Sequence, residues 1–156
     1  MSSASRSLFR QRSFVSLWLG QVFSITGDRF TYLALAGLFF EYSKTNPGTS
    51  YAALLAVFAN VVVAPVLLLA PFTGAWVDRQ NLQRVLVVSD LLRALLVLSI
   101  PFLFELTRST DVVFALVFAL FTVNVVFLPA KSALLPEIVR PDQLLAANSL
   151  LAGAGI

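Results

Sequence analysis

The stretch GAWVDRQNLQRVL, residues 74–86, places an aspartate, two arginines, two glutamines and an asparagine between two long apolar runs. Valine, leucine and phenylalanine dominate the sequence on both sides of it. The whole chain is 58% hydrophobic and only 12% charged, a composition far from that of a soluble domain. The sequence therefore indicates a membrane protein in which residues 74–86 form a polar loop between two membrane helices.

Four apolar runs are long enough to be membrane helices. A bilayer core about 30 Å thick needs roughly 20 apolar residues in a helix. The runs cover residues 14–40, 52–77, 85–104 and, somewhat shorter, 112–128. We therefore expect an all-α, polytopic membrane helix bundle with four transmembrane helices, preceded by a cytoplasmic N-terminal arm over residues 1–13. Pro65 and Pro71 should kink the second helix.

A fifth helix is expected to begin at about residue 142. Arg140, Pro141 and Asp142 place a proline in a first helical turn and an acid near the positive helix end. The apolar residues 144–156 are too few to cross a membrane. The predicted bundle, residues 14–156, then has an incomplete fifth helix, and we expect the chain to be a piece of something longer.

The absence of two residue types excludes several kinds of chemistry. The chain has no cysteine and no histidine, which removes thiolate and imidazole metal sites as well as disulfides. No paired carboxylates suggest acid–base catalysis, and Ser24 has no visible base. We therefore expect no metal, no cofactor and no enzymatic activity.

The positions of the basic residues predict an orientation. Seven of the 11 lie in the N-terminal arm, in the 74–86 loop or after the fourth run: Arg6, Arg10, Arg12, Arg79, Arg84, Lys131 and Arg140. Lys44 and Arg108 lie on the other side, and Arg29 and Arg93 lie inside spans. The positive-inside rule then places the N-terminus and the 74–86 loop in the cytoplasm, in a cell inner or plasma membrane. This distribution favours contact with anionic lipid and argues against nucleic-acid binding.

Two charges interrupt the first run. Asp28 and Arg29 lie near its middle, where a charge costs between about 2.5 and 17 kcal/mol unless it faces a partner, a cavity or water. Gln21, Ser24, Asp28 and Thr31 are spaced by three, four and three residues, so they share one helical stripe. Asp28 is a candidate for proton coupling or for binding a substrate cation, or it pairs with a basic residue of another helix and locks the packing. Arg29 lines the same cavity or extends its long stem outward.

Isolated small and polar residues suggest helix packing. Gly20 and Gly27 allow close approach of a neighbouring helix. Asn60 and Asn124 are isolated polar residues in apolar runs. Each either forms a hydrogen bond to another helix or lines a cavity. We count Asn124 with Gln21 among the candidates for a substrate cavity.

The 74–86 loop contains an unfavourable charge. Asp78 follows the second helix, whose C-terminal end carries partial negative charge, so its carboxylate needs a cation or the N-terminus of another helix. Gly74 lets another helix approach, and Asn81 tolerates the positive φ of a tight reversal. Something is expected to dock on this loop.

The pattern of Gly74, Asp78, Arg79 and Arg84 between the second and third membrane helices resembles the cytoplasmic signature loop of the major facilitator superfamily. Asn81, Leu82 and Gln83 stand where that pattern usually has a glycine and two basic residues. The resemblance implies that Asp78 and Arg79 form a charge network that latches the two halves of a transporter in its outward-open state. Asp90 and Arg93, spaced for an intrahelical pair near the cytoplasmic end of the third helix, either extend this network or form a purely structural pair.

Three further stretches are similar to the bacterial efflux branch that includes macrolide-efflux-like and siderophore-exporter-like proteins: LWLGQVFSITGDRFTYLAL, RVLVVSDLLRALLVL and FLPAKSALLPEIVRPDQLLAANSL. This resemblance implies a twelve-helix fold and a secondary active transporter that exports drug-like or amphipathic small molecules by alternating access with protons as the coupling ion. The partners it implies are the C-terminal helices of the same transporter. A small four-helix membrane subunit with an assembly or interaction role is the alternative.

Overall fold

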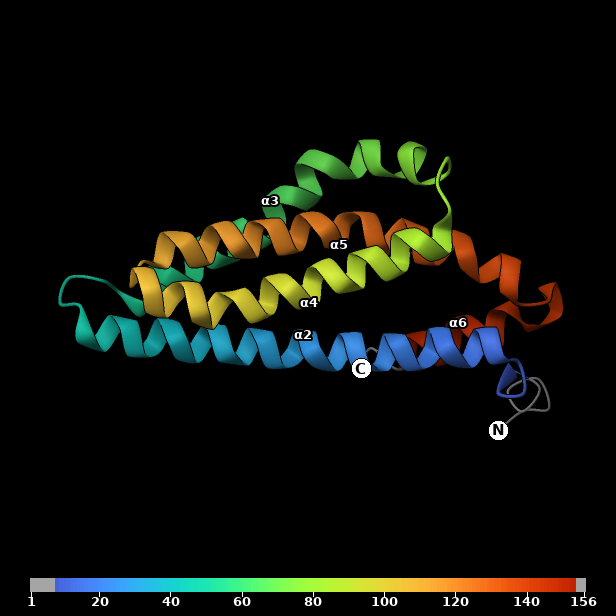
Figure 1. Ribbon diagram of the computed structural model, residues 1–156, viewed down its shortest axis with the longest axis horizontal. Coiled ribbons are helices and arrows are strands. Elements are labelled where there is room, and N and C mark those ends of the chain that lie inside the picture. The colour runs from blue at the N-terminus through green and yellow to red at the C-terminus, as the bar shows by residue number, and fades with distance from the viewer. Residues whose placement is uncertain (1–7, 154–156) are drawn as a thin grey trace. The chain divides into compact units, whose positions relative to one another are not determined.

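The computed structural model describes residues 8–153, and all regular structure in this part of the chain is helical. Four long helices are followed by a short turn and a shorter helix (Figure 1): α2 (Arg12–Thr45), α3 (Tyr51–Val77), α4 (Leu82–Thr107), α5 (Thr110–Ile138), η1 (Pro141–Gln143) and α6 (Leu144–Gly153). The predicted all-α bundle of four long helices and the start of a fifth is therefore confirmed. Arg6, with most of the predicted N-terminal arm, lies outside the described residues.

The fourth long helix extends well beyond the apolar run that predicted it. The run ended at residue 128, whereas α5 continues through Pro129 and Pro136 to Ile138. A proline removes one backbone hydrogen bond, but neighbouring groups in a helical bundle satisfy the freed carbonyl, so the helix need not stop. Since α5 ends at Ile138 and η1 begins at Pro141, the connection after the fourth long helix is short.

Three of the four long helices are long and apolar enough to cross a membrane: α3, α4 and α5. Within the described residues, α2 does not meet this standard, although we expected residues 14–40 to span. The physical reason is its charge content, since Asp28 and Arg29 lie midway along it and Glu41 and Lys44 lie near its end. At 1.5 Å per residue, its 34 residues extend about 51 Å, longer than a bilayer core.

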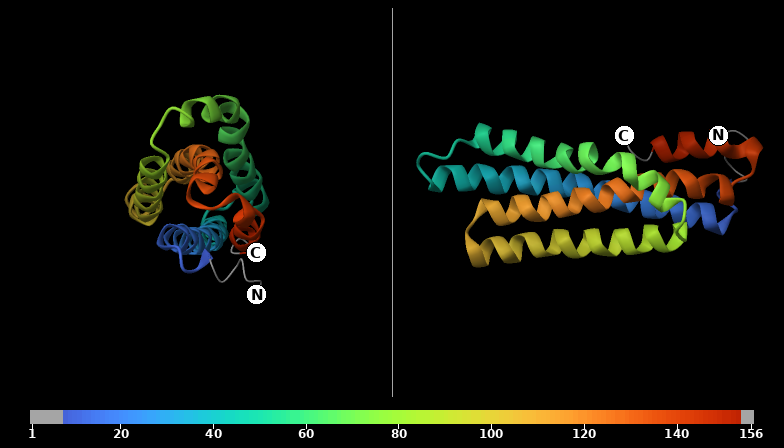
Figure 2. Two further views of the ribbon diagram at one scale, coloured as in Figure 1. Left: turned by 90° about the vertical axis from the view of Figure 1, so that its right-hand side faces the viewer. Right: turned by 90° about the horizontal axis from the view of Figure 1, so that it is seen from above.

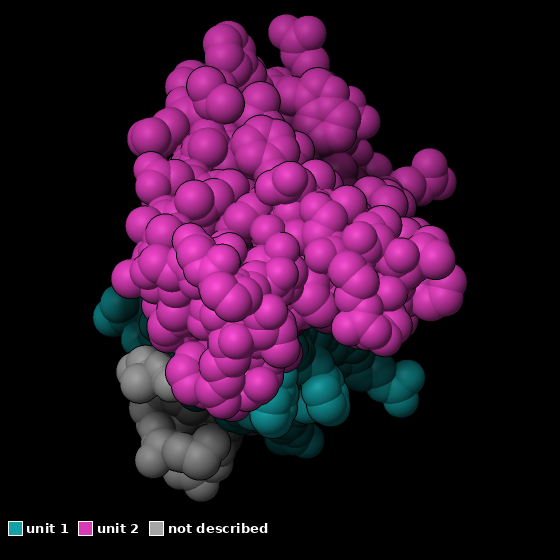
Figure 3. All heavy atoms as spheres, turned by 90° about the vertical axis from the view of Figure 1, so that its left-hand side faces the viewer, with its two compact units in different colours: residues 1–30, 132–156 teal, residues 31–131 magenta. Residues whose placement is uncertain are grey.

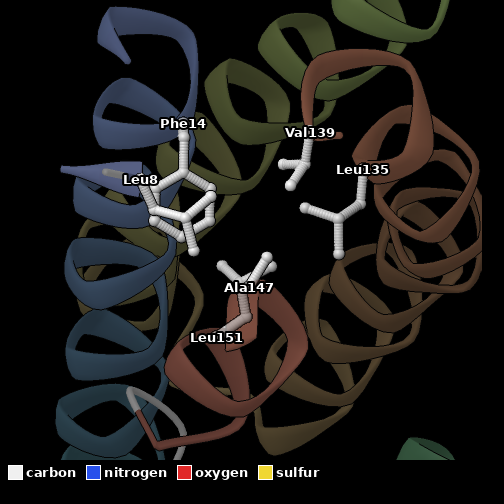
Figure 4. Close-up of a cluster of buried hydrophobic side chains, with 6 residues drawn as sticks. All are labelled: Leu8, Phe14, Leu135, Val139, Ala147 and Leu151. Carbon is white, nitrogen blue, oxygen red and sulfur yellow. The ribbon is translucent and has the colours of Figure 1, made fainter. Parts of the chain in front are cut away.

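The helices form two compact units, coloured separately in Figure 3: residues 1–30 with 132–156, and residues 31–131. The described part of the first unit brings together segments about 130 positions apart in the sequence. Its core consists of Leu8, Phe14, Leu135, Val139, Ala147 and Leu151 (Figure 4). Two hydrogen bonds flank this core: Gln11 Nε2 donates to Gln143 Oε1 at 3.0 Å, and Trp18 Nε1 donates to the Leu150 carbonyl at 3.2 Å.

The second unit has its own apolar core, to which four helices contribute: Leu35, Phe39, Leu54, Ile100, Val113 and Val117. Aromatic rings extend this core. The ring centroid of Phe39 lies 5.9 Å from that of Phe58 on α3 and 5.2 Å from that of Phe114 on α5. All three views in Figures 1 and 2 show α4 beside α5 within this unit.

The second long helix is bent, as the two prolines predicted. Pro65 and Pro71 both lie inside α3, and Figure 1 shows the change in direction along this helix. Each proline removes a backbone donor and displaces the carbonyl four residues before it. Between α2 and α3, Gly48 adopts a φ of 103°, a backbone conformation that residues with a side chain rarely adopt.

Candidate functional site

The 74–86 loop is a tight reversal between α3 and α4. Asp78 follows the last residue of α3, and its backbone N–H donates to the Gly74 carbonyl at 3.1 Å. Asn81 begins α4 by accepting a hydrogen bond from the Arg84 backbone N–H at 3.0 Å. Its φ is −73°, so the positive φ that we expected at Asn81 is not used, and the residue acts as a helix cap instead.

The charged side chains of this loop are exposed: Asp78, Arg79 and Arg84. Among residues 8–153, none of the three takes part in a salt bridge. The Asp78 carboxylate therefore lies at the negative end of α3 without a compensating ion pair in this part of the chain. A Cβ added to Gly74 would meet no described atom within 4 Å, so the helix expected to approach there is not one of those described.

The predicted pair of Asp90 and Arg93 is present on α4. Arg93 Nη1 lies 3.5 Å from Asp90 Oδ1. The Arg93 side chain is only 8% exposed, whereas that of Asp90 is 45% exposed. The guanidinium carbon of Arg93 also lies 5.5 Å from the ring centroid of Phe127 on α5, within the range of a cation–π interaction. Phe127 was not among the sequence candidates.

The bounds of α4 show where along the helix this pair lies. We placed Asp90 and Arg93 near the cytoplasmic end of the third membrane helix. Because α4 spans Leu82–Thr107, Arg93 lies 11 residues after its start and 14 before its end. At 1.5 Å per residue, the pair is roughly 12 to 16 Å along a helix about 39 Å long. Both residues therefore lie nearer to the start of α4, at the 74–86 loop, than to its end.

The polar stripe of the first helix lies on α2 as expected. Gln21 is buried, at 8% exposure, and its Oε1 accepts no hydrogen bond from the described residues. Asp28 and Thr31 are half-buried, and Arg29 is exposed. Gln21 and Asp28 belong to the first unit, and Thr31 belongs to the second.

The two isolated asparagines differ in exposure. Asn60 is exposed, and its Nδ2 donates to the Ala56 carbonyl of its own helix at 2.8 Å, so the predicted bond to another helix is wrong. Asn124 is half-buried on α5, and within residues 8–153 its side chain has no hydrogen bond to another helix. Its spacing of three from Phe127 and four from Leu120 places it on the buried stripe of α5.

Comparison with known proteins finds a similarity to a bacterial protein. The chain is 30% identical over 142 residues to YvqJ of Bacillus subtilis (strain 168), described as an uncharacterized MFS-type transporter. The match covers 90% of this chain and 32% of YvqJ, so the chain spans about a third of the length of that relative. No family model and no solved structure matches the chain.

The fold and this similarity define the class of protein. Three of the described helices are apolar and long enough to cross a membrane, and the similar protein is a transporter. Both observations support the assignment of the chain to the multi-pass membrane proteins. The similarity points to the major facilitator superfamily, because it extends over 90% of the chain. The helices described here fit part of a major facilitator fold.

Proposed function

We propose that this chain is part of a secondary active transporter of the major facilitator superfamily, which exports amphipathic, drug-like small molecules by alternating access with protons as the coupling ion. The observation that carries the proposal is the 30% identity to an MFS-type transporter across nearly the whole chain. The three apolar helices and the charged turn between two of them support it.

The conformational latch of this transporter consists of Gly74, Asp78, Arg79 and Arg84. Their exposure and the position of Asp78 at the negative end of α3 support this assignment. A cation or a helix N-terminus placed against Asp78 would offset the unfavourable dipole interaction, which typically amounts to about 0.3–1 kcal/mol. The mate is a segment of the same transporter that corresponds to the part of YvqJ beyond the match.

The coupling and substrate-cavity residues are Gln21, Asp28, Arg29, Thr31 and Asn124. Asp28 is the acid of this group, half-buried on the helix with the most charges. A carboxylate inside a membrane helix binds and releases a proton as its surroundings change between wet and dry. The buried Gln21 amide and the half-buried Asn124 offer hydrogen bonds to a polar substrate group.

The transporter lies in the inner or plasma membrane with its N-terminus in the cytoplasm. Arg79 and Arg84 in the turn between α3 and α4 support this orientation, since cytoplasmic loops carry an excess of lysine and arginine. Lys44 in the last turn of α2 and Arg108 just after α4 are each paired with an acid three residues earlier, Glu41 and Glu105.

Dye export from cells tests the proposed function. Cells that express the protein from its complete gene should accumulate less of a hydrophobic fluorescent dye than cells with an empty vector, and a protonophore should remove the difference. Asp28→Asn should abolish export while the amount of protein in the membrane stays unchanged. Equal dye accumulation with and without the wild-type protein would contradict an exporter and favour an assembly subunit. Co-purification of a second membrane protein would be the positive result for such a subunit.

A further inference from the structure

The two halves of α3 differ in how they contact the rest of their unit. The apolar core of residues 31–131 includes six side chains from the first half of this helix: Tyr51, Leu54, Leu55, Phe58, Val61 and Val62. Within the described residues, no side chain of α3 after Pro65 belongs to this core. Val77, the last residue of α3, is buried but lies in neither apolar core. The core therefore anchors the first half of α3 and not the second.

The large side chains of the second half are exposed. Leu67, Leu68 and Phe72 are 73%, 62% and 72% exposed, and Trp76 is 52% exposed. Lipid tails are as apolar as these side chains, so the hydrophobic effect gives no force that would hold this half of the helix in one position. Among the described residues, side-chain packing thus does little to fix the direction of α3 beyond Pro65.

Three local features weaken the backbone of the same half. Pro65 and Pro71 both lack the N–H that would donate to the carbonyl four residues earlier, and each ring displaces that carbonyl. Each proline thereby removes roughly one of the four hydrogen bonds that hold a helical turn. Thr73 Oγ1 donates to the Ala70 carbonyl at 3.1 Å, a kind of side-chain bond that often bends helices. Figure 1 shows the resulting change in direction along α3.

We propose that residues 66–77 of α3 form a lever, hinged at Pro65 and Pro71, that swings relative to the anchored half of the helix. The lever leads into the 74–86 loop, and across their junction the Asp78 backbone N–H donates to the Gly74 carbonyl at 3.1 Å. The loop therefore moves with the lever. At 1.5 Å per residue the lever is about 18 Å long, so a change of about 20° at the hinge moves the loop by roughly 6 Å.

The lever gives the 74–86 loop a way to move without disturbing the core. A loop at the end of a lever can reach a docking partner and withdraw from it while the six anchored side chains of α3 stay in place. The importance of this motion for transport rests on the proposed function, in which Asp78 and Arg79 belong to a latch. The motion itself requires neither a substrate nor a gradient.

Distances between pairs of spin labels test the proposal. This chain contains no cysteine, so cysteines introduced at exposed positions can be labelled selectively once any encoded elsewhere in the gene are replaced. One pair joins Gln80→Cys in the loop to Asp111→Cys in the first turn of α5. The reference pair joins Val88→Cys, on the neighbouring α4, to the same Asp111→Cys.

Pulsed electron paramagnetic resonance measures both distance distributions in protein produced from its complete gene and reconstituted in lipid nanodiscs. The distribution from residue 80 should be at least twofold wider than that from residue 88, because only the first reports on the lever. Pro65→Ala combined with Pro71→Ala restores two backbone donors and favours helix, so this variant should fold. It should reduce the width from residue 80 to that of the reference pair.

A proline of the next helix is the matched control. Pro101 also lies inside a membrane helix, but the core residues Ile100 and Phe104 lie on both sides of it. Pro101→Ala should leave the width from residue 80 unchanged, and equal narrowing by this variant and by the double variant would overturn the proposal. A wild-type width no larger than that of the reference pair would also overturn it, since another helix would then hold the lever still. Unchanged width in the double variant would reject the hinge.

The experiment separates this proposal from the proposed function, because label distances do not depend on export or on proton coupling. A wide distribution that the double variant narrows, in a protein that exports no dye, would support the lever and reject the exporter. Dye export by a protein whose wild-type distribution is narrow would support the exporter and reject the lever.

Discussion

The guanidinium of Arg93 lies over the ring of Phe127, with 5.5 Å between its central carbon and the ring centroid, and this contact joins the middle of α4 to α5. Both side chains are buried. A buried cation in a membrane helix is costly unless it has partners, and here the π face of Phe127 and the carboxylate of Asp90 provide them. The contact thus ties one position on α4 to one position on α5.

Replacement of Phe127 tests this contact. Phe127→Leu keeps an apolar side chain but removes the π face, so we expect a loss of about 1–2 kcal/mol in the free energy of unfolding. Phe127→Tyr retains the ring and should lose less. Unfolding in mixed micelles of increasing denaturing detergent, followed by circular dichroism, measures the difference. Equal stability of the leucine variant and the wild type would show that the ring does not stabilise Arg93.

The cap of α4 gives a second prediction. Asn81 Oδ1 accepts a hydrogen bond from the Arg84 backbone N–H, one of the donors left free at the start of a helix. Asn81→Ala should therefore cost about 1 kcal/mol, and Asn81→Asp should cost much less because it keeps an acceptor oxygen. Gln83→Ala, at an exposed position two residues later, is the control and should have little effect. The same detergent titration distinguishes these three variants.

The core in Figure 4 gives a third prediction. Phe14 is fully buried in this cluster, whereas Phe23 of the same helix is 75% exposed. Phe14→Ala leaves a cavity and should cost about 3–5 kcal/mol, while Phe23→Ala creates no cavity. Thermal unfolding in detergent, followed by near-ultraviolet circular dichroism, should show a much larger fall in midpoint for Phe14→Ala. Similar falls for both variants would mean that the cluster does not hold this unit together.

The features that the sequence predicted well depend on local spacing. The four long helices follow from the length of their apolar runs, and the pair of Asp90 and Arg93 follows from a separation of three residues. The bend in α3 follows from its two prolines. In each case the residues that decide the outcome are neighbours in the chain.

The features that the sequence did not predict depend on packing between distant segments or on competing local bonds. Nothing near Arg93 indicated Phe127, because 34 residues separate them and only the packing of α4 on α5 brings them together. Asn60 satisfies its donor with a carbonyl of its own helix, a local bond that an apolar run does not reveal. The continuation of α5 through Pro129 was likewise missed, because a proline usually indicates a helix end but does not enforce one.

Asp78 gives a final prediction, in which stability and transport change in opposite directions. Its exposed carboxylate lies at the negative end of α3, and within the described residues no salt bridge compensates it. Asp78→Asn removes a charge that opposes the helix dipole, so the helical unit should become slightly more stable, by about 0.3–1 kcal/mol. If Asp78 latches the transporter, the same variant should nevertheless lose most dye export, because the contact it makes during the transport cycle is gone.

Export assays measure this loss on cells with equal amounts of membrane-inserted wild-type and variant protein. The control is Asp142→Asn, because Asp142 is an exposed acid at the start of the fifth helix. Full export by Asp78→Asn would remove Asp78 from the latch and leave its position at the end of α3 without a functional explanation.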